Sequence, residues 1–408
     1  MPFHRRDFLK SSAALASASL IAPHLLGQQQ SQTGALQGGV ESGKVKFSPI
    51  SGAGQKRESG PPDALPPEKR VGYAIVGLGR LALEEVLPAF GECKRSKPVA
   101  LVSGHREKAE TVAQQYGLDA KNIYSYDNYD QIAQNPAIQV VYVILPNSMH
   151  ADFTVRAAKA GKHVFSEKPM ATSSQDCQRM IDACHQAQRK LGIAYRSQYE
   201  PKDMRIVEMA RSGAIGKLKN FLSTNSQQQG DPNQWRLKRA LSGGGCLPDV
   251  GIYCLNAARF ISGEEPAEVI GHTWSTPGDP RFREVEELCQ FTLRFPSGFH
   301  ANCTCSYGIH KSQMFRLEGD QGWIELNPAY AYRGLHMKYA KLEGKEDAQV
   351  EPQIEDKNQF ALEMDAFSDC VLNNTQPKTP GEEGLKDQRI IETIYESART
   401  GRPVTLKS

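Results

Sequence analysis

Two residues with ionisable side chains and a proline follow a short apolar run in HVFSEKPM, residues 163–170. Glu167 offers a carboxylate, Lys168 offers an ammonium group, and Pro169 restricts the backbone just beyond them. Open α/β sheets bind their ligands at the carboxyl ends of parallel strands. We therefore expect Lys168 to face a ligand at such an edge, whereas a surface ion pair with Glu167 fits this position poorly.

A second group of candidate residues lies in SGGGCLPDVGIYCLNAARF, residues 242–260. The three glycines predict a loop, and Pro248 suits the first turn of a helix. Asp249 and Tyr253 would then lie four residues apart on one helix face. A nearby lysine cation favours the ionised form of a tyrosine, so Tyr253 is a candidate general acid and base. The alternative is that Tyr253 is an aromatic residue of the core.

A glycine-rich turn follows the first apolar strand in VGLGRLA, residues 76–82. Gly77, Gly79 and Ala82 give the G-x-G-x-x-A form of the dinucleotide-binding motif. The first glycine makes the turn, and the second lets the backbone approach a pyrophosphate at the helix N-terminus. Because strands and helices alternate on both sides of this turn, we predict a nucleotide site.

The end of the second strand decides which nucleotide fits. An NAD site usually carries an acid there, but this chain has Ser103, 24 residues after Gly79, followed by Gly-His-Arg. Ser103, Arg106 and Lys108 could bind a 2′-phosphate, although the two cations could also be solvated helix residues. The missing acid still argues against NAD, and we predict NADP.

Strands alternating with helices must position these residues. The pattern predicts an α/β fold, with an N-terminal Rossmann domain, a doubly wound parallel sheet, over 71–197. Strands are expected at 71–76, 98–104, 140–146 and 191–197, and a further buried strand is expected to end at Val164-Phe165. Thr172 to Gln175 have capping-box form before a helix. Short alternating runs after about residue 200 predict a C-terminal α+β domain over 198–408, with a large open, mostly antiparallel sheet and two closing helices, the last with Gly401 as its C-cap.

The N-terminal 70 residues do not resemble a folded domain. Paired arginines, Arg5 and Arg6, precede a mild apolar stretch, which predicts a twin-arginine signal peptide over 1–27 and no stable membrane insertion. A weak amphipathic helix is the alternative. Residues 28–70 form a Pro/Gly/Gln-rich arm, either a flexible linker or a segment that becomes ordered on a neighbouring subunit.

Composition narrows the functional classes. The 408 residues carry a formal net charge of only +3 without a long basic run, which argues against nucleic-acid binding. The nine cysteines and ten histidines are scattered, so we expect neither a metal site nor a disulfide scaffold. Cys303 and Cys305 alternate with polar residues and are interpreted as sheet packing.

Five stretches together resemble the glucose–fructose oxidoreductase family within the Gfo/Idh/MocA group, over about Val71 to Val404. They are AIVGLGRLAL, LPNSMHADF, AGKHVFSEKPMATS, GGGCLPDVGIYCLNAARF and PGEEGLKDQRIIETIYESARTGRPV. The resemblance implies hydride transfer between a sugar carbon and nicotinamide, with Tyr253 as acid/base, Lys168 as its electrostatic partner and Asp249 as a ligand of sugar hydroxyls. It also implies cofactor contacts at Gly77, Leu78, Gly79, Arg80, Ser103, Lys108, Tyr126, Leu145, Asn147, His150, Glu167, Lys168, Arg196, Trp235, Arg236 and Tyr332.

Two of these contacts have a more specific expectation. Trp235 and Arg236 offer a stacking face and a phosphate-binding fork. Glu167 would orient Lys168 or contact the nicotinamide amide.

Export would constrain the reaction. The twin-arginine route carries folded proteins, and the periplasm is not expected to supply free NADP. We therefore predict a periplasmic homo-oligomer, a dimer or tetramer, that retains NADP(H). It would oxidise a glucose-like aldose to its lactone and reduce a fructose-like ketose, or a second aldose, by a ping-pong reaction. The alternatives are an aldose 1-dehydrogenase with dissociable NADP and a non-catalytic sugar-binding protein.

Overall fold

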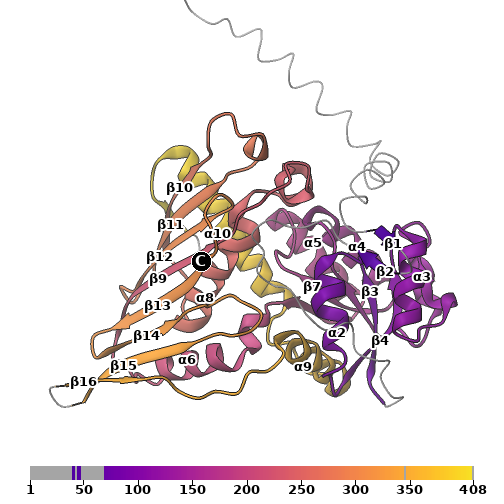
Figure 1. Cartoon of the computed structure of the whole chain (residues 1–408), viewed down its shortest axis with the longest axis horizontal. Coiled ribbons are helices and arrows are strands. Elements are labelled where there is room, and N and C mark those ends of the chain that lie inside the picture. The colour runs from indigo at the N-terminus through magenta and orange to yellow at the C-terminus, as the bar shows by residue number, and fades with distance from the viewer. Residues whose placement is uncertain (1–38, 42–43, 47–68, 344–345, 407–408) are drawn as a thin grey trace, which may run out of the picture.

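The computed structural model describes residues 39–41, 44–46, 69–343 and 346–406 (Figure 1). The predicted signal peptide at 1–27 lies outside the described residues. Of the predicted arm, a short hairpin is described, in which β1 (Gly39–Glu41) pairs with β2 (Lys44–Lys46). This hairpin lies beside helix α3 (Arg106–Gln115) (Figure 1).

Six parallel strands form the first sheet, in the order β5-β4-β3-β6-β7-β8. This is the strand order of a doubly wound Rossmann sheet, so the predicted class is confirmed. The chain reverses direction across the sheet between β3 and β6, and this is where such folds bind ligands. The strands are β3 (Val71–Val76), β4 (Ser96–Val102), β5 (Ile123–Tyr124), β6 (Val140–Val143), β7 (His163–Glu167) and β8 (Leu191–Ala194).

Some predicted boundaries in this domain are wrong. The second strand begins two residues early, at Ser96, and β6 ends at Val143 instead of continuing to residue 146. Helix α5 (Ser174–Gln186) is capped by Ser173, whose hydroxyl accepts from the Asp176 backbone N–H. The predicted capping box is therefore displaced by one residue.

Nine strands form the second sheet, which is mixed but mostly antiparallel, as predicted. Among its described pairs only β9 and β12 run parallel. Helices α6 (Pro201–Arg211), α8 (Ile252–Ser262) and α10 (Gly381–Thr400) lie behind this sheet in Figure 1. The strands are β9 (Leu218–Ser226), β10 (Glu268–Trp274), β11 (Leu288–Arg294), β12 (His300–Ser306), β13 (Ser312–Gly319), β14 (Gly322–Leu326), β15 (Met337–Glu343), β16 (Glu346–Val350) and β17 (Val404–Thr405).

Interior packing agrees with two predictions from sequence. Cys303 and Cys305 on β12 are buried free thiols, as expected for sheet packing. Gly401 follows α10 with a φ of 66°, the left-handed conformation of a C-cap glycine.

Helix α9 (Gln359–Asn373) connects the two halves of the protein, because it packs on the first sheet (Figure 1). The Tyr73 hydroxyl donates to the Met364 carbonyl at 2.9 Å, and the Phe165 and Phe367 rings stack with their centroids 5.0 Å apart. Helix α9, which follows strand β16 in the sequence, therefore completes the core beside β3 and β7.

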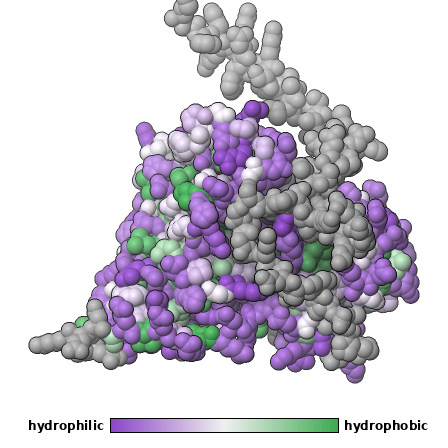
Figure 2. Space-filling model, in the orientation of Figure 1, coloured by the Kyte–Doolittle hydropathy of each residue, from purple (hydrophilic) through white to green (hydrophobic). Residues whose placement is uncertain are grey.

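The surface is mainly hydrophilic. Figure 2 shows hydrophilic residues over most of the described part of this face, with hydrophobic residues in small, separate areas. No helix of the described ranges has the length and apolar content needed to cross a membrane.

Candidate active site

The glycine turn after β3 has the geometry that a dinucleotide requires. Gly77 has a φ of +94°, and a Cβ there would lie 2.2 Å from the Ile144 carbonyl oxygen. A Cβ at Gly79 would meet no atom within 4 Å. Gly77 is therefore needed for the fold, whereas Gly79 leaves open space beside the backbone, where a pyrophosphate would approach. Arg80 pairs with Glu84 at 2.8 Å at the start of the following helix.

The edge of β4 carries the residues predicted to select the nucleotide. Ser103 is buried, and its Oγ accepts from the His105 N–H at 3.1 Å. Lys108 is also buried, and this burial lowers the pKa of its ammonium group. Arg106 instead pairs with Glu110 at 2.7 Å and donates to the Ile123 carbonyl. Ser103 and Lys108 thus remain the better candidates for contact with a 2′-phosphate.

The structure brings Lys168, Asp249 and Tyr253 together from two segments 81 residues apart in sequence. Lys168 Nζ donates to the Asp249 backbone oxygen at 2.7 Å and lies 3.7 Å from Asp249 Oδ1. The same ammonium group lies 4.4 Å from the centroid of the Tyr253 ring. These three residues had been predicted as a catalytic group, and they occupy one cluster at the carboxyl end of β7.

Two further side chains fix the Asp249 carboxylate. Its Oδ2 accepts from Tyr307 Oη at 2.6 Å and from Arg236 Nε at 3.1 Å. Burial alone would raise the pKa of Asp249, but the Arg236 and Lys168 cations hold it below its ordinary value. Oδ1 takes no part in these two hydrogen bonds and faces Lys168 Nζ at 3.7 Å.

The expectation that Arg236 contacts a phosphate stays a prediction, and the structure adds a partner that was not expected. The structure pairs the Arg236 guanidinium with Asp249 and places it 4.5 Å from the Trp235 ring centroid. Arg236 helps to position this partly buried carboxylate, so we assign it to the Asp249 cluster.

The helix that carries Asp249 and Tyr253 begins differently from the prediction. Residues Leu247–Gly251 form a π-helical turn, and regular α8 starts only at Ile252. Pro248 lies in the first turn, as expected. Asp249 and Tyr253 are therefore not one regular α-helical turn apart, because the wider turn separates them.

Arg196 is a buried cation beneath Tyr253. It is only 3% exposed, and its guanidinium carbon lies 4.9 Å from the Tyr253 ring centroid and 4.5 Å from that of Tyr332. It donates to the Tyr330 carbonyl at 2.6 Å and to Gln359 Oε1 at 2.5 Å. Arg196 was predicted as a cofactor contact, but the protein itself already occupies most of its donors.

Two other predicted cofactor contacts are also occupied by backbone groups. His150 is fully buried, with Nδ1 3.0 Å from the Pro169 carbonyl and Nε2 2.8 Å from the Leu145 carbonyl. Asn147 Nδ2 donates to the Ser242 carbonyl at 2.8 Å. Both side chains hold loops of the site in place.

The remaining predicted contacts lie around the same edge. Leu145 is buried after β6, and Tyr126 packs edge-on against Phe153 with the ring centroids 5.3 Å apart. Leu78 is buried in the core below the glycine turn. Glu167 is buried at the end of β7 and accepts from the Tyr142 hydroxyl at 2.8 Å.

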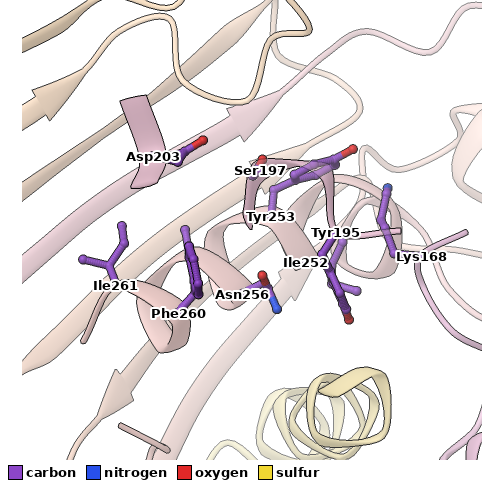
Figure 3. Close-up of a pocket in the computed structure, with 10 residues that line it drawn as sticks. Lys168, Tyr195, Ser197, Asp203, Ile252, Tyr253, Asn256, Phe260 and Ile261 are labelled. Carbon is purple, nitrogen blue, oxygen red and sulfur yellow. The ribbon is translucent and has the colours of Figure 1, made fainter. Parts of the chain in front are cut away.

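A pocket opens beside the catalytic cluster. Lys168 and Tyr253 line it, and it continues along α8 to Phe260 and Ile261 (Figure 3). Asp203, on α6, lines the end near Ile261 (Figure 3). No group of side chains in the described ranges has the composition of a metal site.

Sequence reasoning missed Tyr307, Tyr142 and Glu363. Tyr307 directly follows β12, and Glu363 lies within α9, more than 100 residues after the site motifs. No local pattern marks them, because only the packing of distant segments brings them to Asp249 and Glu167.

Known proteins resemble this chain along most of its length. A family model described as "Oxidoreductase family, NAD-binding Rossmann fold" matches residues 71–195, and one described as "GFO/IDH/MocA C-terminal domain" matches residues 204–325. D-xylose 1-dehydrogenase [NADP(+)] of Haloarcula marismortui is 32% identical over 82% of this chain and 93% of its own.

Solved structures agree with this assignment. Aldose-aldose oxidoreductase from Caulobacter crescentus, complexed with glycerol, is 46% identical, with a TM-score of 0.80 over 83% of this chain and 100% of its own. A levoglucosan dehydrogenase structure, 20% identical with a TM-score of 0.73 over 83% of this chain and 100% of its own, shares the fold. The chain therefore belongs to the GFO/IDH/MocA family of oxidoreductases.

Proposed function

We propose that this protein is an NADP-dependent sugar oxidoreductase that oxidises an aldose at C1 to its lactone. The observation that carries the proposal is the cluster of Lys168, Asp249 and Tyr253 beside the dinucleotide turn. Two relatives support the substrate class, because one is named a D-xylose 1-dehydrogenase with NADP(+) and the other an aldose-aldose oxidoreductase.

The residues present fit NADP. Gly77 makes the turn, and Gly79 leaves space for the pyrophosphate. Ser103 directly follows β4 and Lys108 lies in the first turn of α3, and no carboxylate among residues 103–106 would repel a 2′-phosphate. When bound, NADP would supply the hydride acceptor for the aldose and the hydride donor for a second sugar.

Tyr253 and Lys168 would carry the proton and charge chemistry. Tyr253 takes the C1 hydroxyl proton, and the Lys168 ammonium stabilises the negative charge that develops on that oxygen. Asp249 holds Lys168 by an ion pair at 3.7 Å and is itself fixed by Arg236 and Tyr307. The ammonium group is thereby oriented before substrate arrives, which lowers the cost of reaching the transition state.

A second sugar would complete a ping-pong cycle on retained NADP(H). The acceptor would be a fructose-like ketose or a second aldose, and the name of the Caulobacter relative favours the aldose. The hairpin formed by β1 and β2, from the arm, lies beside α3, near the predicted 2′-phosphate site. This placement supports the idea that the arm covers the adenine end of the nucleotide.

Export belongs to the same proposal. Arg5 and Arg6 would direct the folded protein through the twin-arginine route to the periplasm, where retained cofactor is needed. Replacing both arginines by lysine should leave the protein in the cytoplasm when cells are fractionated. If the variant were still found in the periplasm, twin-arginine export would be contradicted.

The assembly is expected to be a dimer or tetramer, and light scattering would establish which.

One purification tests the catalytic proposal. The protein is isolated without added nucleotide and denatured, and the supernatant is analysed for NADP. Bound NADP, together with glucose-dependent reduction of fructose or a second aldose, supports the ping-pong enzyme. Activity only with added NADP supports a simple aldose 1-dehydrogenase, the activity named in the Haloarcula relative. Absence of both activities would indicate a sugar-binding protein.

Tyr253→Phe provides the sharpest variant. It removes only the hydroxyl, so nucleotide should stay bound while turnover falls by at least about 100-fold, the contribution of a general acid or base. An unchanged rate would refute the assigned mechanism.

A further inference from the structure

Two buried carboxyl groups lie on either side of one tyrosine hydroxyl below the catalytic cluster. Tyr142 Oη lies 2.8 Å from Glu167 Oε1 and 3.4 Å from Glu363 Oε1. Glu167 ends β7, next to Lys168, whereas Glu363 comes from α9 on the far side of the sheet edge. The three side chains therefore form a short polar chain that reaches the active site.

Glu363 is unusual because no counter-ion among the described residues lies within hydrogen-bond distance of it. It is 0% exposed, and its Oε2 has no hydrogen-bond partner among the described residues. Burial raises the pKa of Glu363 well above its ordinary value, and the Glu167 charge raises it further. Burial also raises the pKa of Glu167, while Lys168 and Arg196 oppose this. Two such groups so close together cannot both be ionised cheaply, so they hold one proton between them.

We propose that Glu167 and Glu363 form a proton-sharing pair. This pair would retain, inside the protein, the proton that the sugar hydroxyl releases. This inference rests on the proposed function and deepens it. In the oxidative half-reaction the sugar O–H bond would break as ionised Tyr253 takes the proton, and bound NADP would accept the C1 hydrogen with its electron pair. The new Tyr253 O–H bond would then break as the ionised member of the pair forms an O–H bond, which returns Tyr253 to its ionised form. The reductive half-reaction returns that proton to the second sugar.

The surroundings of the pair suit this role. Bulk water is excluded from Glu363, so a proton held there exchanges slowly with solvent. The Arg196 cation lowers the pKa of both carboxyls, against the effect of burial, and its guanidinium carbon lies 4.9 Å from the Tyr253 ring centroid. The charged and titratable groups that interact electrostatically with the pair are Lys168, Arg196, Tyr142, Tyr199 and Tyr332.

Proton release during a single turnover tests the pair. Holoenzyme in weak buffer with a pH indicator is mixed with excess aldose and no second sugar, and NADPH absorbance and proton release are recorded together. The wild type should release clearly less than one proton per NADPH formed. Glu363→Gln keeps the size and hydrogen-bonding capacity of the side chain but cannot exchange a proton, so the pair loses one of its two sites and proton release per NADPH should rise above that of the wild type.

A control and a second measurement complete the test. Asp369→Asn removes an exposed carboxylate from the same helix and should behave as the wild type. The infrared spectrum of the resting wild type should contain the band of a protonated carboxylic acid that Glu363→Gln lacks.

The outcomes separate this inference from the function on which it rests. Absence of an NADPH signal contradicts the proposed function. Full proton release by the wild type, despite a normal NADPH signal, overturns the pair without touching the function. A wild type without the carboxylic-acid band overturns the pair as well. The same holds if Glu363→Gln releases no more protons per NADPH than the wild type. The wild-type measurements decide even where the variant does not fold.

Discussion

Asp249→Asn tests whether a fixed carboxylate holds the site together. The substitution keeps the shape of the side chain and removes its charge. At present the carboxylate accepts from Tyr307 at 2.6 Å and from Arg236 at 3.1 Å, and it faces Lys168 at 3.7 Å. An asparagine has only one acceptor oxygen, and its NH2 group would face a donor. Because both hydrogen bonds reach Oδ2, an amide oxygen in that place keeps them as weaker bonds to a neutral acceptor, while the NH2 group replaces Oδ1 and faces the Lys168 ammonium.

The contacts set the expected magnitude. A hydrogen bond to a charged group contributes about 1.5–3 kcal/mol. Breaking a fully buried ion pair costs about 3–5 kcal/mol, but water can partly solvate Arg236 because its side chain is 33% exposed. We expect the free energy of unfolding to fall by about 2–4 kcal/mol. Loss of Lys168 orientation should also lower kcat by roughly 10- to 100-fold, which corresponds to about 1.4–2.7 kcal/mol of barrier.

Urea denaturation at two pH values provides the assay. The pKa of folded Asp249 is lowered, so its stabilisation is complete above the unfolded value of 3.8 and is lost as the pH falls through the lower folded value. The difference between wild type and variant should therefore be full at neutral pH and shrink in acid. Asp130→Asn is the control, because this carboxylate pairs with Arg156 but is 69% exposed, and its removal should change stability by less than about 0.5 kcal/mol. If Asp249→Asn had the same stability and kcat as the wild type, this reasoning would be wrong.

Three further variants test separate parts of the structure. Gly77→Ala should melt at a lower temperature than the wild type, because its Cβ would lie 2.2 Å from the Ile144 carbonyl oxygen at a φ of +94°. Gly79→Ala should melt normally but lose nucleotide affinity in a binding titration. If the two variants behaved alike, the assignment of the turn would be wrong. Lys108→Ala should weaken NADP binding more than NAD binding by calorimetry, and an equal loss would remove Lys108 from the 2′-phosphate site. Burial and nearby cations lower the pKa of His163 to about 4, so the fold favours its neutral form and loses stability as the pH falls from 6.5 towards 4. In His163→Gln the urea midpoint should therefore change less with pH over this range. An unchanged pH dependence would show that other groups cause the loss.

Local chemistry explains what could be predicted from the sequence. The glycine spacing after β3 and the buried runs of β3, β6 and β7 follow from backbone sterics and hydrophobic burial, so the Rossmann sheet and its nucleotide edge were predictable. The clustering of Lys168, Asp249 and Tyr253 was also predictable, because strand ends and a family motif place them.

Tertiary structure decided the partners of these residues. The pairing of Arg236 with a carboxylate 13 residues away was not predicted, because it depends on how the loop folds onto the helix. Tyr142 and Glu363 are 221 residues apart, and only the return of α9 to the first sheet brings them together. Long-range pairs of this kind leave no local pattern, because they depend on how two whole elements pack. The sequence alone therefore determined the nucleotide edge and its Lys168, whereas the proton-sharing pair beneath it depends on the tertiary structure.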